Sequence, residues 1–189
     1  MMPLIKNRLH KGDLAPVFQM PDLQDNIVSS LDFRGRWLLL SFYRYASCPL
    51  CNLRVHKLAG LHAAWQKRGL DMLAIFQSPA DKLRLYVGNQ EPPFPLIPDP
   101  EQTLYHHYGV GHSWTGFLLA WGKRLPEIGR AVLREGYFPG SVEGGIHRIP
   151  ADFLVSPDGR IAEAHYGRDI GDHLPIARIE QHLARWSPA

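Results

Sequence analysis

Blocks of apolar residues separated by polar stretches predict a protein in which strands and helices alternate. Two nearly continuous apolar runs, Trp37 to Tyr43 and Asp71 to Gln77, suit strands that are buried on both faces of a sheet. The segment 51–68 between them carries apolar residues at helical spacing, and Gly69 is a natural helix stop. The central part of the chain is therefore predicted to be a β-α-β unit.

Further elements are predicted on either side of this unit. Residues 17–20 and 27–31 read as a short hairpin around a polar turn. Residues 80–89 have helical composition, whereas the proline-rich stretch 92–100 is predicted to be a loop with a short extended piece. Residues 101–108 read as a helix that ends at Gly109.

The end of the chain adds two strands and a helix. Residues 151–156 and 160–166 read as strands joined by a Pro-Asp-Gly turn. Residues 172–186 are predicted to be a helix with Asp172 as its N-cap and a buried stripe of Ile176, Ile179, Leu183 and Trp186. The order predicts an α/β layer fold with a mixed central sheet flanked by helices.

Residues 112–147 interrupt this order. Their apolar residues recur at steps of three and four, which predicts one or two amphipathic helices broken near Leu125-Pro126. The opposite face carries Lys123, Arg124, Arg130 and Arg134. We therefore expect a single domain, 1–189, with a helical insertion at about 112–147. The insertion either packs passively on the domain, roofs the active site, or forms a dimer contact.

Composition narrows the class of protein. Of the 189 residues, 45% are hydrophobic and 21% charged, which is the balance of a folded globular domain and excludes wholesale disorder. The net charge of +3 is scattered, and no run of five or more Lys or Arg supports nucleic-acid binding. No apolar stretch resembles a signal peptide or a membrane span, so we expect a cytoplasmic protein without membrane or nucleic-acid partners.

The chain has two cysteines, Cys48 and Cys51, directly after a predicted strand and at the start of a predicted helix. Free N–H groups and the helix dipole stabilise a thiolate there, and two intervening residues let the second thiol close a disulfide. Pro49 is tolerated in the first turn. The pair is therefore predicted to be redox-active and catalytic, with no cofactor.

Two other readings of the pair stay open. The cysteines are inert and buried, or they belong to a zinc site. A closed zinc site needs four ligands, and neither His56 nor His62 has a spacing that completes one with both sulfurs. We expect no metal.

Four residues are candidates for supporting roles. Pro150, just before a predicted strand, is a candidate for a cis bond that places its backbone against the disulfide. Arg44, four residues before Cys48, and Arg148 are candidates for positive charge near the thiolate, as is Arg54.

Several segments resemble one family. Residues 11–18 (KGDLAPVF) are similar to the opening of the peroxiredoxins and related redoxins, the AhpC/TSA group. Phe94 to Pro100, Tyr108-Gly109-Val110 and Phe153 to Ile161 resemble further segments of that family. The resemblance covers roughly 11–111 and 146–186, and it implies a thioredoxin fold.

The active-site motif departs from the family pattern P-x-x-x-T-x-x-C. Laid over that pattern, Arg44 replaces the proline, Cys48 replaces the threonine, and Cys51 takes the place of the cysteine that attacks peroxide. The family's later arginine falls at Pro150, where thioredoxins carry a cis-proline. The site resembles a peroxiredoxin-like branch that carries a CxxC. Thioredoxin logic makes Cys48 the attacking thiol and peroxiredoxin logic makes it Cys51.

The resemblance implies a peroxiredoxin-like thiol oxidoreductase that reduces hydroperoxides or disulfides through a Cys48/Cys51 dithiol-disulfide cycle. The partners would be a peroxide or a protein disulfide, together with an external thiol reductant such as a thioredoxin or glutathione system. A homodimer is possible. The alternatives are a protein-disulfide oxidoreductase without peroxidase activity, and a non-catalytic redox-sensing or binding protein that uses Trp114, Phe117 and Trp121 as a partner surface.

Overall fold

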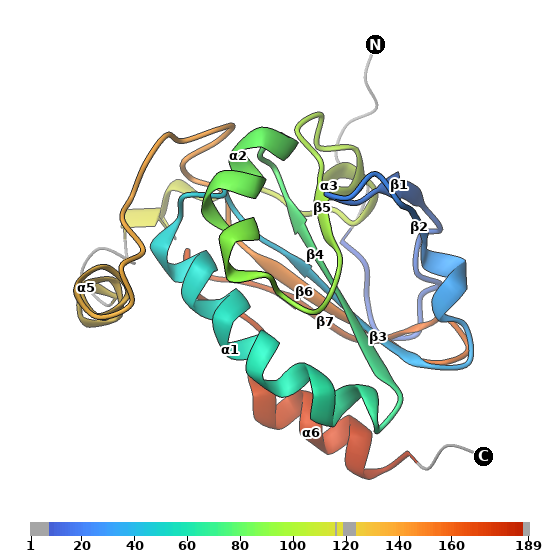
Figure 1. Ribbon diagram of the computed structural model, residues 1–189. Helices are drawn as coiled ribbons and strands as arrows, with labels where there is room; N and C mark the ends of the chain where they lie inside the picture. The colour runs from blue at the N-terminus through green and yellow to red at the C-terminus, as the bar shows by residue number, and fades with distance from the viewer. Residues whose placement is uncertain (1–7, 116, 119–123, 187–189) are drawn as a thin grey trace.

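The computed structural model describes residues 8–115, 117–118 and 124–186, and its centre is a five-stranded mixed sheet (Figure 1). The strand order is β5-β4-β3-β6-β7. The strands are β3 (Trp37–Phe42), β4 (Leu70–Phe76), β5 (Leu96–Pro98), β6 (Ala151–Val155) and β7 (Ile161–Tyr166). β3 pairs parallel with β4 and antiparallel with β6. The predicted mixed α/β sheet is confirmed.

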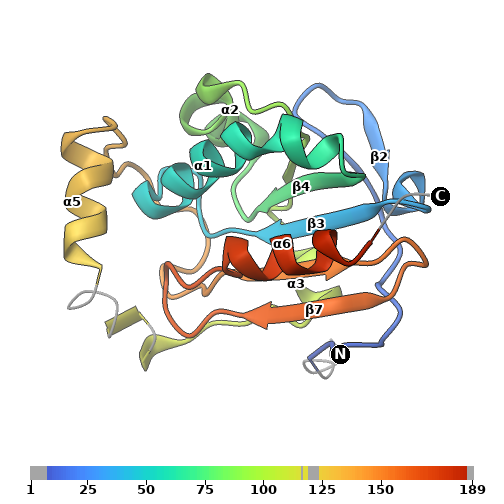
Figure 2. The same cartoon turned by 90° about the horizontal axis from the view of Figure 1, so that it is seen from below.

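Helices and a hairpin cover both faces of this sheet. The helices α1 (Pro49–Gln66), α2 (Ala80–Tyr86) and α6 (Ile176–Ala184) pack on one face. The short helix α3 (Thr103–His107) and the hairpin of β1 (Gln19–Pro21) and β2 (Ile27–Ser29) pack on the other. Figure 2 shows α1 and α6 side by side along the sheet, with α3 behind it. Short 3₁₀ turns lie at Ser30–Phe33 (η1) and Gly88–Gln90 (η2).

Strand β3 is the central element, because all six of its residues are buried. Leu39 belongs to the core under α1, and Leu38 and Leu40 belong to the core under α3. A strand that is apolar on both faces is stable only between two layers, which is why the continuous apolar run predicted it correctly. Its carboxyl end leads straight to the two cysteines.

The last helix begins later than predicted. α6 begins at Ile176 with Pro175 as its N-cap, so the prediction that Asp172 caps it is wrong. The Asp172 carboxylate instead accepts a hydrogen bond from the Arg168 backbone N–H (2.9 Å) and lies 3.3 Å from the His165 ring. These contacts fix the loop after β7 and leave the carboxylate no role at the helix.

The insertion contains helix α5 (Leu125–Leu133), which begins at the predicted break with Pro126 in its first turn. α5 lies off the sheet, beside the amino-terminal part of α1 (Figures 1 and 2). Arg124 is more than a solvated residue of the polar face, because its guanidinium forms an ion pair with Asp169 at 3.1 Å. Trp121 and Lys123 lie outside the described residues. After α5, residues 134–147 return toward the ends of β3 and β4.

Among the described residues, no helix is both long enough and apolar enough to cross a membrane.

Candidate active site

The site begins in the loop that joins β3 to α1. Residues 43–48 are all buried, and Cys48 is the N-cap residue of α1, with Pro49 in the first turn. The Asn52 side chain secures this junction by donating to the carbonyl oxygens of Ala46 (2.7 Å) and Cys48 (3.0 Å). The motif therefore lies where a rigid strand meets the positive end of a helix.

Cys48 and Cys51 are free thiols, and each is only 1% exposed. The side chain of Arg44 is buried beside them, with its Nη1 3.4 Å from the Cys48 sulfur. The same guanidinium lies over the rings of Tyr45 (4.9 Å) and Phe117 (5.9 Å) and donates through Nη2 to the Ile146 carbonyl. The structure thus brings Arg44, Cys48 and Cys51 together.

The two thiols have opposite acidities. Burial raises the pKa of Cys48, but hydrogen bonds from Cys51 and the charge of Arg44 outweigh burial and lower that pKa to about 6. Burial and the neighbouring Cys48 both raise the pKa of Cys51 well above the ordinary thiol value. The reduced pair therefore consists of a Cys48 thiolate that accepts hydrogen bonds from a protonated Cys51 and from Arg44.

Tyr45 is a residue of the site that the sequence analysis missed. Burial raises its pKa to about 12, and the neighbouring Cys48 also raises it, whereas Arg44 lowers it. Tyr45 is therefore a neutral phenol, and its ring packs against the Arg44 guanidinium, 4.9 Å from the ring centre. A tyrosine in a loop carries no spacing signal, so nothing in the chain marked it.

Arg148 is also buried, but its hydrogen bonds go to groups other than the two sulfurs. Its guanidinium donates to Gln77 Oε1 (2.9 Å), to the Val110 carbonyl (2.7 Å) and to Gln102, and it lies 4.5 Å from the Tyr105 ring centre. Arg148 therefore ties the end of β4 to the segments after β5 and α3. Arg54 is likewise engaged elsewhere, because its Nη2 donates to the Leu174 carbonyl at 2.8 Å.

The hypothesis of a cis bond at Pro150 is wrong. Every peptide bond in the described part of the chain is trans. A turn from Gly145 to Arg148 (3.0 Å between N and O) brings the chain into β6 and directs Arg148 inward, so a cis bond is not needed. The Pro150 carbonyl accepts from the Gly167 N–H at 2.9 Å and joins β6 to the end of β7.

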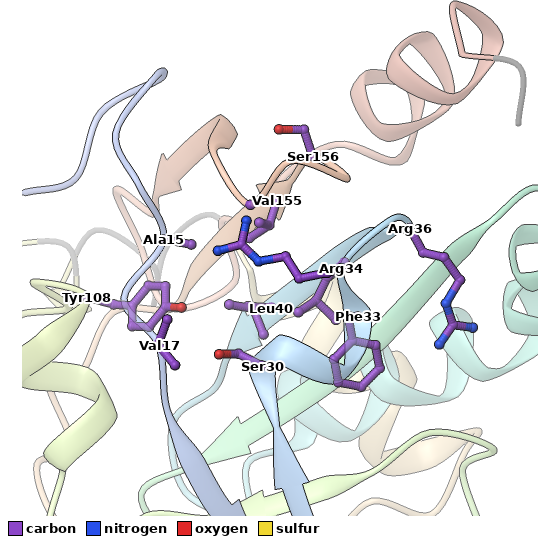
Figure 3. A pocket seen from close by; sticks show the side chains of 12 residues that line it. Ala15, Val17, Ser30, Phe33, Arg34, Arg36, Leu40, Tyr108, Val155 and Ser156 are labelled. Carbon is purple, nitrogen blue, oxygen red and sulfur yellow. The ribbon is translucent and has the colours of Figure 1, made fainter. Parts of the chain in front are cut away.

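Two pockets differ in size and in their distance from the cysteines. Figure 3 shows a small pocket between Arg34, Leu40, Tyr108 and Val155, toward the opposite end of β3 from the cysteines. Its volume of about 20 Å³ is enough for little more than a water molecule. A larger cleft of about 520 Å³ lies between α1 and α5, where Leu50 of the CxxC motif and His173 contribute to its lining.

The hypothesis of a zinc site can be compared with the residues that the structure describes. They contain no group of three or more His, Cys, Asp or Glu side chains placed to hold a metal ion. The neighbours of the sulfurs are Arg44 and Tyr45, which are not zinc ligands in proteins.

Comparison with known proteins identifies the family. The model of the AhpC/TSA family matches residues 11–164. The chain belongs to the AhpC/TSA family. Peroxiredoxin Bcp of Escherichia coli (strain K12) is 30% identical over 155 residues, which cover 82% of this chain and 84% of that protein. These findings confirm the predicted class, a peroxiredoxin-like thiol-dependent oxidoreductase.

Solved structures confirm the thioredoxin-like fold. Peroxidoxin BcpB from Mycobacterium tuberculosis superposes with a TM-score of 0.65 at 15% identity, covering 94% of this chain and 96% of that one. A putative thiol:disulfide interchange protein DsbE from Chlorobium tepidum superposes with a TM-score of 0.64 at 19% identity, covering 93% and 97%. At these identities the likeness concerns the fold.

Proposed function

We propose that this AhpC/TSA protein reduces a hydroperoxide with Cys48 as the attacking thiolate and Cys51 as the resolving thiol. The contact between Arg44 Nη1 and the Cys48 sulfur, at 3.4 Å, carries the assignment. A guanidinium favours the charged form of the sulfur that it touches, and the thiolate is the nucleophile. The overlay with the family motif favours Cys51 instead, so the proposal departs from the family pattern.

The cycle has two chemical steps in the protein. The Cys48 thiolate attacks the terminal oxygen of the hydroperoxide, the O–O bond breaks, and the alkoxide leaves as an alcohol after protonation. Cys48 is then a sulfenic acid. The Cys51 sulfur attacks it, the disulfide forms, and water leaves with the proton of Cys51. The dithiol loses two electrons, and the peroxide gains them.

Burial favours a peroxide over a protein disulfide as the substrate. Both sulfurs are 1% exposed. Attack on a disulfide needs a direct approach of the thiolate to one sulfur of the bond, and a folded protein substrate cannot bring its disulfide into so closed a site without a large rearrangement. A hydroperoxide presents its reacting oxygen at the end of a small group.

The proposed cycle needs an external reductant. The disulfide uses both cysteines of the chain, so the electrons that restore it come from outside, from a thioredoxin or glutathione type of thiol. A cytoplasmic location would supply such reductants. The whole chain, 1–189, would act as one thioredoxin-like unit with its insertion at about 112–147. We also predict a homodimer, which a light-scattering measurement of the molar mass would test.

The test uses the wild type and the variants Cys48→Ser and Cys51→Ser with dithiothreitol as the reductant. Cys48→Ser is expected to lose peroxide consumption, and Cys51→Ser is expected to accumulate a sulfenic acid on Cys48 that dimedone traps for mass spectrometry. Trapping on Cys51 in the Cys48→Ser variant, with its rate intact, would reverse the assignment. If neither variant differs from wild type, the dithiol cycle is wrong.

An insulin-disulfide reduction assay separates the two other functions. High insulin reduction without peroxide consumption would identify a protein-disulfide oxidoreductase. The absence of both activities would favour the redox-sensing protein, whose candidate surface includes Trp114 (60% exposed). Trp121, the third residue of that candidate surface with Phe117, lies outside the described residues.

A further inference from the structure

Residues 134–147 contact the loop that carries Cys48, and we call this segment the cover. Two residues of the loop that carries Cys48 bond to it. Ser47 Oγ donates to the Ser141 carbonyl at 2.6 Å, and Arg44 Nη2 donates to the Ile146 carbonyl. With the cover in this position, solvent scarcely reaches either sulfur.

Glu143 holds the cover with both its side chain and its backbone. Its carboxylate accepts from Ser78 Oγ at 2.8 Å, and the same Ser78 oxygen accepts from the Ala46 N–H at 2.8 Å. The Glu143 carbonyl accepts from Gln77 Nε2 at 2.7 Å. One residue of the insertion is thus joined to the end of β4 and, through Ser78, to the active-site loop. Hydrogen bonds to a carboxylate are stronger than neutral ones.

The apolar side chains of the cover add little to its attachment. Phe138 is 66% exposed, Val142 43% and Ile146 38%. A segment that buries little apolar surface and is held by a few hydrogen bonds opens at a small cost in free energy compared with the core. The cover can therefore lift without unfolding the sheet beneath it.

Arg44 connects the cover to the Cys48 sulfur, because its Nη1 contacts that sulfur and its Nη2 donates to the Ile146 carbonyl of the cover. We propose that the cover is a gate for reactants, that Glu143 is the positioning residue that keeps it closed, and that Arg44 transmits its position to Cys48. Coupling between two equilibria is reciprocal. Closing the cover favours the thiolate, and loss of the thiolate charge in the disulfide weakens the hold of Arg44 and favours opening.

This inference rests on the proposed function for the meaning of the thiolate, but it is tested on the thiols alone. The rate of alkylation of Cys48 by iodoacetamide is followed from pH 5 to 10 in the reduced protein, with the modified cysteine identified by mass spectrometry. Glu143→Ala is expected to raise the plateau rate on the order of 10-fold, as one lost hydrogen bond allows, and to move the pH midpoint upward.

The matched variants separate positioning from a general structural effect. Glu143→Gln keeps an oxygen that accepts from Ser78, so its rate and midpoint should lie between those of wild type and Glu143→Ala. Glu135→Ala removes a carboxylate of the same segment that faces Arg130 at 3.9 Å, and it should match wild type. Ser78→Ala removes the partner, and the double variant with Glu143→Ala should react no faster than the faster single variant.

The disulfide form provides an independent reading. Amide hydrogen exchange in residues 140–147 is expected to be faster in the disulfide form than in the dithiol form. Wild-type alkylation rates and midpoints in both Glu143→Ala and Ser78→Ala, or equal exchange in the two redox forms, would overturn the inference. Peroxide consumption is measured on the same samples. A cover that behaves as described in a protein without that activity would refute the proposed function and leave the gate intact.

Discussion

The substitution Arg44→Met tests which sulfur carries the charge. Arg44 Nη1 lies 3.4 Å from the Cys48 sulfur. Two unit charges at that distance attract by about 5 kcal/mol at an effective dielectric constant of about 20, which is an upper limit because water enters the space that the guanidinium leaves. Measured effects of a neighbouring opposite charge are about 1–3 pKa units. We therefore expect the pKa of Cys48 to rise by about 2 units, which corresponds to about 2.7 kcal/mol.

The consequence is largest at neutral pH. With a pKa of about 6, Cys48 is roughly 90% thiolate at pH 7. After a rise of about 2 units it would be roughly 10% thiolate, so peroxide consumption at pH 7 should fall about 10-fold and recover at about pH 9. The assay is the pH–rate profile of peroxide consumption, paired with the alkylation profile of Cys48. Arg44→Lys keeps the charge and should show a smaller shift.

Arg54→Met is the control, because Arg54 lies in α1 together with Cys51 and its guanidinium donates to the Leu174 carbonyl. It should leave the midpoint of the alkylation profile where wild type has it. An unchanged midpoint in Arg44→Met, or first alkylation at Cys51 at pH 7, would refute the electrostatic argument.

Three other predictions concern the scaffold and metal. Gly69→Ala should lower the free energy of unfolding by about 1–2 kcal/mol in urea, because Gly69 has φ +75° and an added Cβ would lie 2.5 Å from the Trp186 ring; an unchanged value would contradict this. Asp152→Asn should cost about 3 kcal/mol at pH 7, because the buried carboxylate accepts from the Leu174 N–H (2.7 Å) and lies 2.9 Å from His173 Nδ1. Burial raises the pKa of Asp152, but His173 and Arg54 lower it well below its usual range, so this stabilisation is complete above the ordinary carboxyl pKa and lost as pH falls further; the difference between the two proteins in urea should shrink in acid. A chelator should leave peroxide consumption unchanged, and a zinc content near one per chain in the active protein would contradict that.

The layers of the fold were predictable because their signals are local. The apolar run that became β3 is buried along its whole length, and helical spacing found α1 to within two residues of its ends. The residues at which helices begin and end were harder to predict. Asp172 is a residue type that often caps helices, but its carboxylate contacts Arg168 of its own loop and His165 of β7, and the helix begins after Pro175.

The cover could not be predicted, because it is held by contacts between residues far apart in the chain. Glu143 meets Ser78 across 65 positions, and Ser141 meets Ser47 across 94. The exposed apolar side chains of the segment give no helical or strand period that points at the cysteines. Roofing of the site was one of three interpretations of the insertion. Only the folded chain shows that residues 134–147 contact the loop that carries Cys48.

The proposal that Cys48 is the nucleophile depends on considering two departures from the family pattern together. The motif overlay treats Arg44 in place of proline and Cys48 in place of threonine as separate losses. In the folded chain they form one contact of 3.4 Å between a guanidinium and a sulfur. Since α1 begins at Pro49, Cys48 lies at the N-cap, outside the first turn, whereas Cys51 lies inside it. The arginine and the helix terminus therefore act on the same sulfur, which moves the acidic thiol three residues toward the amino terminus from its family position.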